Sequence, residues 1–276
     1  MKFYSLKTKE IYEEKDNVML SFLYHNLMGR IILKILTTKT VANIARLYEN
    51  SFLSKGKINS FIKKNNIDMT EYEETSYKSF NDFFMRRIKK DKRKLEKGLI
   101  SPCDAKLSVY RIDDNLKMEI KNSIYTIDEL IKADASKFKG GYAFIYRLAV
   151  DDYHHYIYPF TGEVVDSKTI KGVLHTVQPI ALKKYKVFSE NTRVVTNVMT
   201  KEYGEVAIIE VGAMIIGKIV NEDLTKFKRG DEKGHFEFGG STIIYLFKDN
   251  IKVNKKIIEN SLNDIETIVK MGNSLE

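Results

Sequence analysis

The chain has 276 residues, of which 43% are hydrophobic and 30% charged, with a formal net charge of +9. A chain of this length and composition can bury a substantial core, and the balance is typical of an intracellular enzyme. The single cysteine, Cys103, excludes an internal disulfide framework. No signal peptide is expected, because the first residues are polar and the first apolar stretch lacks a small-residue cleavage site.

The N-terminal third has helical periodicity. Between residues 18 and 36, apolar side chains recur at helical spacing and a polar stripe recurs every four residues, which predicts an amphipathic helix; the apolar set is Leu20, Leu23, Tyr24, Leu27, Ile31 and Ile35, and the polar set is Asn26, Arg30 and Lys34. The apolar runs are too short for a membrane span, which needs about 20 apolar residues. Residues 40–66 continue as helix, and residues 79–97 place several phenylalanines on a helix-like face.

A strand-rich part begins near Leu99. Apolar runs bounded by glycine-containing turns predict strands at 142–150, 206–210, 214–220 and 241–247. The tail from Asn250 predicts a short strand and a helix within 258–271. The expected fold class is α+β, with N-terminal amphipathic helices (residues 1–97) followed by a mainly antiparallel β-rich domain (residues 98–276).

Positive charge is concentrated between residues 86 and 97, which contain eight lysines or arginines. Such a stretch is either a solvated surface or a site for an anionic partner. An anionic lipid surface attracts each nearby basic residue by about 1 kcal/mol. A nucleic-acid-binding module is compatible with the charge, but the sequence contains no motif that supports one.

Three segments contain the residue types of a serine-based reaction centre: Ser101-Pro-Cys-Asp104-Ala-Lys106, Asp152-Tyr-His154-His-Tyr-Ile-Tyr-Pro159 and Phe238-Gly-Gly-Ser241-Thr242. Serine is a poor nucleophile until a base takes its proton, and a carboxylate commonly orients that base. Ser241, His154 and Asp104 supply one group of each kind. Alternation along an extended segment places His154 and Tyr156 on one face and Tyr153 and His155 on the other.

Together these segments resemble the phosphatidylserine decarboxylase family, whose members carry a Ser-Pro-x-Asp-Gly turn, an Asp-Tyr-His segment and a Gly-Ser-Thr cleavage site in this order. The resemblance covers roughly residues 20 to 250. It also includes Ser79-Phe-Asn-Asp-Phe-Phe-Met-Arg-Arg87, Val177-Gln-Pro-Ile-Ala-Leu182 and Glu210-Val-Gly-Ala213.

The resemblance implies a proenzyme that cuts itself between Gly240 and Ser241. Ser241 would attack the carbonyl of Gly240, with His154 as the base and Asp104 orienting His154. Elimination and hydrolysis would then convert Ser241 into a covalent pyruvoyl group, the pyruvate cofactor, leaving a long chain (1–240) and a short chain (241–276) that remain associated. No metal is required.

The implied reaction, a step of phospholipid biosynthesis, converts phosphatidylserine into phosphatidylethanolamine and CO2 through a Schiff base with the pyruvoyl group, which acts as an electron sink. The substrate lies in an anionic membrane, so the resemblance implies a peripheral protein on the cytoplasmic face of the cell membrane, attached through residues 18–36 and nearby segments. It also suggests a homodimer, and no nucleic-acid partner is expected.

Two residues depart from the family pattern. Many relatives have a second histidine where this chain has Ile157, and a glycine where it has Ala105. Isoleucine cannot donate a proton, so if the second histidine helps decarboxylation, this protein either uses another donor, such as His154 or a neighbouring tyrosine, or is slower. Two alternatives therefore stay open: a homologue, processed or unprocessed, that binds lipid without efficient turnover, and a pyruvoyl decarboxylase of a different amino substrate.

Overall fold

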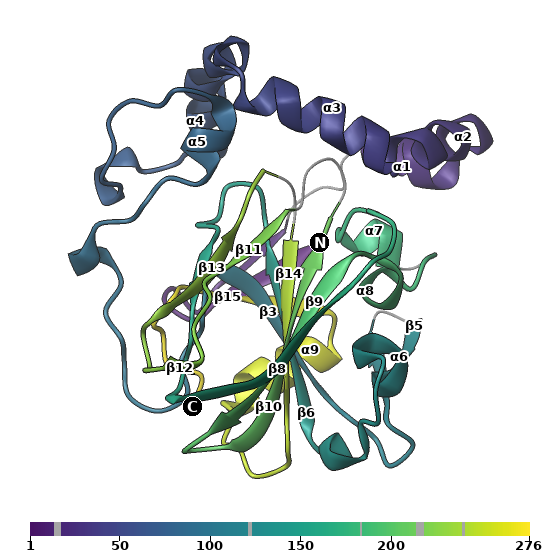
Figure 1. Ribbon diagram of the computed structural model, residues 1–276, viewed down its shortest axis with the longest axis vertical. Coiled ribbons are helices and arrows are strands. Elements are labelled where there is room, and N and C mark those ends of the chain that lie inside the picture. The colour runs from purple at the N-terminus through teal and green to yellow at the C-terminus, as the bar shows by residue number, and fades with distance from the viewer. Residues whose placement is uncertain (14–17, 121–122, 183, 214–217, 239–240) are drawn as a thin grey trace.

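The computed structural model describes residues 1–13, 18–120, 123–182, 184–213, 218–238 and 241–276. Gly240 and part of the strand predicted at 214–220 lie outside the described residues. The remainder forms one large mixed sheet, two small sheets and a set of helices gathered mainly in the first third of the chain (Figure 1). The predicted α+β class, with N-terminal amphipathic helices before a mainly antiparallel part, is confirmed.

The large sheet has ten strands, and every described pairing in it is antiparallel except that of β1 with β15. Its order is β12 (Lys226–Phe227), β8 (Gly162–Ile170), β9 (Arg193–Thr200), β10 (Gly204–Gly212), β14 (Ser241–Phe247), β6 (Tyr142–Leu148), β3 (Ala105–Arg111), β15 (Ile265–Val269), β1 (Lys2–Ser5) and β2 (Ile11–Glu13). All seven side chains of β14 are buried, because both faces of the sheet are covered at its centre.

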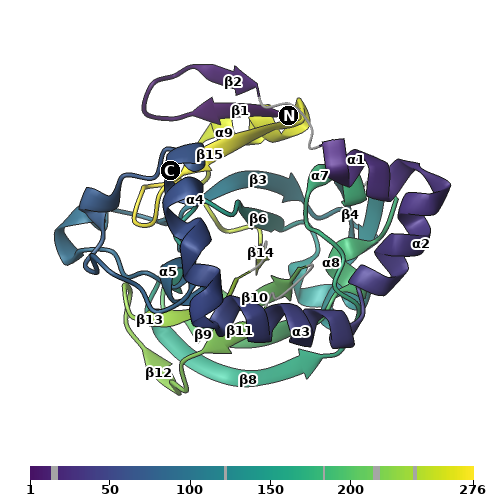
Figure 2. The same cartoon turned by 90° about the horizontal axis from the view of Figure 1, so that it is seen from above.

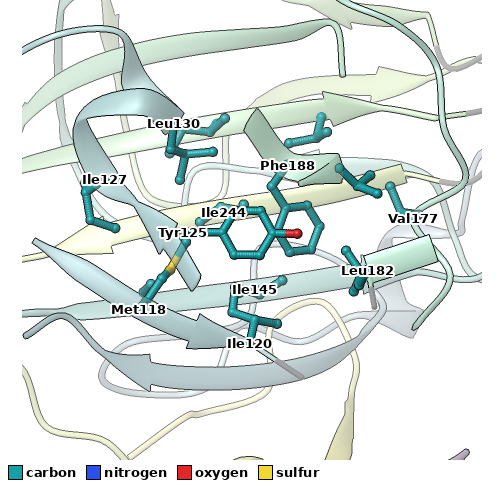
Figure 3. Close-up of a cluster of buried hydrophobic side chains, with 14 of the residues drawn as sticks. Met118, Ile120, Tyr125, Ile127, Leu130, Ile145, Val177, Leu182, Phe188 and Ile244 are labelled. Carbon is teal, nitrogen blue, oxygen red and sulfur yellow. The ribbon is translucent and has the colours of Figure 1, made fainter. Parts of the chain in front are cut away.

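Two smaller sheets accompany the large one. Strands β11 (Ile219–Asn221), β13 (Glu232–Phe236) and β7 (His155–Ile157) form a three-stranded sheet, and β4 (Lys117–Ile120) pairs with β5 (Ser123–Thr126). The interior between the three-stranded sheet and one face of the large sheet holds an apolar core that includes Tyr156, Phe236 and Ile243. The opposite face of the large sheet carries a second core, in which Tyr125 and Phe188 pack near Ile145 and Ile244 (Figure 3).

The helices are short. The α-helices are α1 (Val18–His25), α2 (Leu27–Leu36), α3 (Lys39–Asn50), α4 (Ile58–Asn65), α5 (Phe80–Phe84), α6 (Ile127–Ile131), α7 (Pro179–Leu182), α8 (Val187–Glu190) and α9 (Lys255–Leu262), and the 3-10 helices are η1 (Phe52–Lys57), η2 (Met69–Glu71), η3 (Lys90–Lys92) and η4 (Ser136–Phe138). Figures 1 and 2 place α1 to α4 over the end of the large sheet at which β14 begins.

The prediction of one helix over residues 18–36 is wrong. The segment forms two helices whose axes differ by 99°, and the break lies at Asn26. The Asn26 side chain accepts a hydrogen bond from the Met28 amide and caps α2, which is the competition with helix continuation that asparagine commonly provides. Neither this pair nor any other described segment forms a single helix long and apolar enough to cross a membrane, although α1 and α2 together have the length and composition.

Two other elements differ from the expectation. The phenylalanine-rich segment at 79–97 forms only the short helix α5, and residues 258–271 divide between the end of α9 and strand β15. Strands β1 and β2 were not predicted, because β1 is stabilised by pairing with β15, more than 250 residues away. The boundary at residues 97 and 98 stays a prediction.

Candidate active site

Ser241 begins the central strand β14, where its backbone lies between two neighbouring strands. It pairs with Gly212 of β10 on one side and with Leu148 of β6 on the other. The residue is fully buried, and its Oγ has no hydrogen-bond partner among the described atoms. A buried hydroxyl normally has a partner, so Ser241 Oγ is notable for having no competing hydrogen bond within the described residues.

His154 lies just before β7 and is also fully buried. Its Nδ1 lies 2.9 Å from the backbone oxygen of Asp152. Since a carbonyl oxygen only accepts, Nδ1 carries the hydrogen and Nε2 carries the free lone pair. Nε2 is buried without a hydrogen-bond partner in the described part of the chain. Burial lowers the pKa of His154 to about 3, so at neutral pH the ring is uncharged and Nε2 can accept a proton.

Helix α5 connects His154 with the segment that leads to Ser241. The Phe84 ring packs against the His154 ring at a centroid distance of 4.0 Å and against the Phe238 ring at 5.1 Å. The amide of Phe238 donates to Asn81 Oδ1 at 2.9 Å. The strand β13 is held in the same place, because the Phe236 amide donates to the His154 carbonyl at 3.0 Å. One short helix therefore orients the histidine and the approach to the serine together.

Asp104 is buried, but its hydrogen bonds do not go to His154. The Arg93 guanidinium donates to both carboxylate oxygens, at 3.0 and 2.7 Å, and Lys270 Nζ donates at 2.9 Å. The Met271 amide donates to Oδ1 at 2.8 Å. Burial would lower the pKa of Lys270, yet the carboxylate of Asp104 raises it. In this structure Asp104 joins three segments of the chain, and the expected direct contact that orients His154 is not formed.

Asp152 takes the orienting position instead. Its carbonyl accepts from His154, while its carboxylate accepts from Lys106 Nζ at 2.7 Å and from the Ala149 amide at 2.8 Å. Burial would raise the pKa of this carboxyl, but Lys106 and Lys270 outweigh burial and lower the pKa to about 2. Asp152 is therefore ionised at neutral pH, and its charge lies close enough to His154 to favour the imidazolium.

The two departures from the family pattern have distinct surroundings. Ala105 begins β3 and is not among the described residues with positive φ, so its side chain causes no backbone strain there. Ile157 lines a cavity of about 430 Å³ together with Tyr153 and His155. The predicted alternation is confirmed, since Tyr153 stacks on His155 while Tyr156 lies in the core between the sheets. The family's second histidine position thus faces away from His154.

One cluster has the composition of a metal site within the described residues: His155, Glu232 and His235. The side chains of His155 and Glu232 already have other partners, whereas His235 Nδ1 is buried without one among the described residues. His155 Nδ1 lies 2.6 Å from Glu232 Oε1, His155 Nε2 lies 2.9 Å from the Met85 carbonyl, and Arg87 pairs with the second oxygen of Glu232. The cluster forms an ion-pair network that holds β7 against β13 and α5. The absence of a metal from the reaction stays a prediction.

Sequence reasoning missed several residues around this centre. Asn81 and Phe84 belong to a segment that was noted, but a five-residue helix has too little periodicity to show which side chains face inward. Asp152 lies two residues before His154 in the chain and could have been selected as an alternative carboxylate. Arg93 belongs to the basic stretch, where its burial against Asp104 could not be foreseen.

Comparisons with known proteins show which family this chain resembles. The model of the family described as phosphatidylserine decarboxylase matches residues 80–275. The chain is 48% identical over 276 residues to a protein named phosphatidylserine decarboxylase proenzyme 2 from Clostridium acetobutylicum, covering 97% of this chain and 95% of that relative. It is 38% identical over 281 residues to a phosphatidylserine decarboxylase proenzyme from Fusobacterium nucleatum, covering 96% and 94%. A proenzyme of the same name from Clostridium botulinum is 36% identical over 287 residues, covering 99% and 97%.

A match of this extent defines the chain as a carboxy-lyase, an enzyme that releases a carboxyl group as CO2. The chain belongs to the phosphatidylserine decarboxylase family. The word proenzyme in the names of these relatives further indicates that they are made as precursors.

Proposed function

We propose that this protein converts phosphatidylserine into phosphatidylethanolamine and CO2 after cutting itself between Gly240 and Ser241. The observation that carries the proposal is that Ser241 Oγ and His154 Nε2 are both buried without a hydrogen-bond partner among the described residues, while Phe84 packs against the His154 ring and against Phe238, three residues before Ser241. Ser241 and His154 both belong to the motifs through which the chain resembles its family. A nucleophile and a neutral base, each held without a competing partner, are the two groups that self-cleavage requires.

In the proposed cleavage, His154 Nε2 takes the proton of Ser241 as Oγ attacks the carbonyl carbon of Gly240. The peptide bond breaks and an ester forms, so the amino group of Ser241 becomes a new N-terminus. Elimination from Ser241 then releases the carboxylate of Gly240, and hydrolysis of the dehydroalanine releases ammonia. The carbonyl of Asp152 keeps His154 in the tautomer that accepts at Nε2. Asp104 acts at a distance, by holding the turn that precedes β3.

Position 241 fits a covalent pyruvoyl group, because the residue that would be converted is the buried Ser241, whose Oγ has no hydrogen-bond partner among the described residues. When formed, the pyruvoyl group supplies an electron sink for loss of the carboxyl group. Among the described residues, His154 is the candidate for holding the proton that must be returned to the carbanion left by the loss of CO2. Tyr156 is directed elsewhere, since its hydroxyl donates to Asn221 at 2.8 Å.

The long and short chains should remain associated after the cut. Residues 241–276 include β14, which pairs along its length with both β10 and β6, and β15, which pairs with β3 and β1. Removing the short chain would expose a buried strand at the centre of the sheet. A homodimer remains a prediction from the family resemblance.

We also propose peripheral attachment to the cytoplasmic face of the cell membrane through α1, α2, α3 and η1. Among the described residues, 13 of the 22 exposed large hydrophobic side chains lie between residues 18 and 53. One face of these helices packs on the body of the protein, where the Thr176 amide donates to the Tyr24 hydroxyl and Leu33 is buried. The opposite face keeps Leu27, Ile31 and their neighbours exposed, and an apolar surface of this extent is typical of a binding face.

The basic stretch contributes less free charge than its composition implies. The guanidinium of Arg86 is buried and donates to the Tyr72 hydroxyl and the Asp151 carbonyl, and Arg93 pairs with Asp104. Two of the eight positive charges are therefore internal. The remaining charges support attraction to an anionic lipid surface over a shorter segment than the sequence indicated.

The intact mass of freshly purified protein under denaturing conditions tests the proposal. Wild type should yield a chain ending at Gly240 and a 36-residue chain lighter than one with a serine N-terminus by the mass of ammonia. The Ser241→Ala variant should remain a single chain of 32.0 kDa. An uncut wild-type chain after prolonged incubation would refute self-cleavage and favour a homologue that only binds lipid.

The substrate is tested separately on the processed protein. Release of CO2 from phosphatidylserine liposomes but not from free serine is the expected result, because the apolar helices lie over the end of the sheet at which Ser241 is buried. Release from free serine at an equal rate would favour the alternative of a different amino substrate.

A further inference from the structure

A second buried polar group lies near Ser241. Glu210 of β10 is 0% exposed and Lys233 of β13 is 1% exposed, and their charged atoms Oε1 and Nζ lie 2.6 Å apart. Removing two such charges from water costs several kcal/mol for each ion, and well-packed apolar residues of similar size commonly stabilise a core equally well. Stability alone therefore does not account for a charged pair at this position.

The backbone aims Lys233 into the interior. The pairing of β13 with β7 shifts register between Glu232 and Gly234, so Lys233 is the extra residue of a β-bulge. A bulge redirects the side chain that it carries. Here it directs a lysine from the three-stranded sheet across the interior to a carboxylate of the ten-stranded sheet.

Glu210 contacts further strands through the same carboxylate. Asn221 of β11 donates to Glu210 Oε2 at 3.4 Å, and the Asn221 oxygen accepts from the Tyr156 hydroxyl of β7 at 2.8 Å. Lys233 Nζ also donates to Thr196 Oγ1 of β9 at 3.4 Å. One carboxylate thus connects all three strands of the small sheet to the large sheet.

The position of the pair relative to Ser241 follows from the register. Glu210 lies opposite Ile243 of β14, and Gly212, two residues further along β10, lies opposite Ser241. Side chains two residues apart on a strand point to the same face, so Glu210, Ile243 and Ser241 face the same interior. Diagonal neighbours of this kind are about 7–8 Å apart.

The chain crosses from one sheet to the other at the predicted cleavage site. Strand β13 ends at Phe236 in the three-stranded sheet, and β14 begins at Ser241 in the ten-stranded sheet. Lys233 lies on the strand before the crossing, and Glu210 lies on the strand that pairs with β14 after it. The ion pair therefore links the two sheets to which β13 and β14 belong, close in sequence to the predicted cleavage site.

We propose that the Glu210–Lys233 ion pair is a positioning pair for self-cleavage. It holds β13 and β10 at the spacing that brings the peptide bond between Gly240 and Ser241 within reach of Ser241 Oγ. This inference rests on the proposed function. Misplacing reacting atoms by about 1 Å can cost a factor on the order of 100 in rate. The pair acts through the backbone and touches neither reacting atom.

The test compares the single variants Glu210→Gln and Lys233→Met with the double variant that carries both changes. Each single variant leaves one buried charge unpaired and should lose stability, whereas the double variant removes both charges and should keep the wild-type melting temperature. The first-order rate of self-cleavage is measured on freshly translated chains by gel densitometry. The double variant is expected to cut at least tenfold more slowly than wild type while remaining folded.

A matched control is the buried pair Arg147–Glu266, which joins β6 to β15 and has similar exposure. The double variant Arg147→Met with Glu266→Gln should cut at the wild-type rate. Wild-type cutting by the Glu210→Gln and Lys233→Met double variant would overturn the proposal, as would equal slowing in the control. If wild type itself remains uncut, the proposed self-cleavage fails; if wild type cuts and the double variant cuts equally fast, only this inference fails.

Discussion

The burial of His154 predicts an unusual pH dependence for self-cleavage. A histidine with an ordinary pKa near 6.5 is only about 3% neutral at pH 5, so a reaction that needs the neutral ring would slow about 30-fold between pH 8 and pH 5. Burial lowers the pKa of His154 to about 3, and at pH 5 the ring then remains about 99% neutral. The rate of self-cleavage should therefore be nearly constant from pH 5 to pH 8.

The assay uses precursor made by cell-free translation, divided among buffers from pH 5 to pH 8 and stopped with detergent at timed intervals. Gel densitometry then gives the first-order rate at each pH. A tenfold or larger fall with a midpoint near pH 6.5 would refute the assignment of His154 as a buried neutral base. A flat profile with loss of cleavage in His154→Ala would support it.

Folding must be followed at each pH, because the same pKa shift affects stability. The folded pKa of His154 lies below its unfolded value, so between pH 6.5 and pH 3 the unfolded chain binds a proton that the folded chain does not. The contribution of His154 to the free energy of unfolding is fully present above pH 6.5. It decreases as the pH falls toward 3, at up to about 1.4 kcal/mol per pH unit. At pH 5 this loss is about 2 kcal/mol, and circular dichroism shows whether the chain is still folded.

Two further predictions concern the ion pairs of Asp104 and the proposed membrane-binding surface. Asp104→Asn removes the charge that pairs with Arg93 and Lys270. Breaking such a buried contact should cost about 3–5 kcal/mol and lower the melting temperature by roughly 10 °C, measured by calorimetry. An unchanged melting temperature would show that the ion pairs of Asp104 are dispensable for stability. Leu27→Asp with Ile31→Asp should abolish sedimentation with anionic liposomes, because each apolar side chain contributes roughly 1.5–3 kcal/mol when buried in lipid. The control Val165→Asp, an exposed residue on β8, should sediment like wild type, and sedimentation of the double variant at the wild-type level would contradict the proposed surface.

Local patterns were sufficient for the elements whose signals lie within a short window. The run Ser241–Phe247 is apolar from Ile243 onward and is bounded by turn residues, and it forms β14 with the predicted bounds. The alternation around His154 was also predictable, because side-chain direction in an extended segment depends only on position along the chain. Family motifs brought Ser241 and His154 together as candidates for the same reason, since each motif is a short stretch with an unusual composition.

Contacts between distant segments were decided only by the tertiary structure. Strand β1 forms because β15 provides a partner from the other end of the chain, and Asp104 is bound by Arg93 and Lys270, which no local pattern connects. The orientation of His154 by a backbone carbonyl was equally invisible, because every residue has one. The sequence by itself determined which residue types could perform the chemistry, whereas the packing of α5 and β13 decided which of them are buried, unpaired and placed to do so.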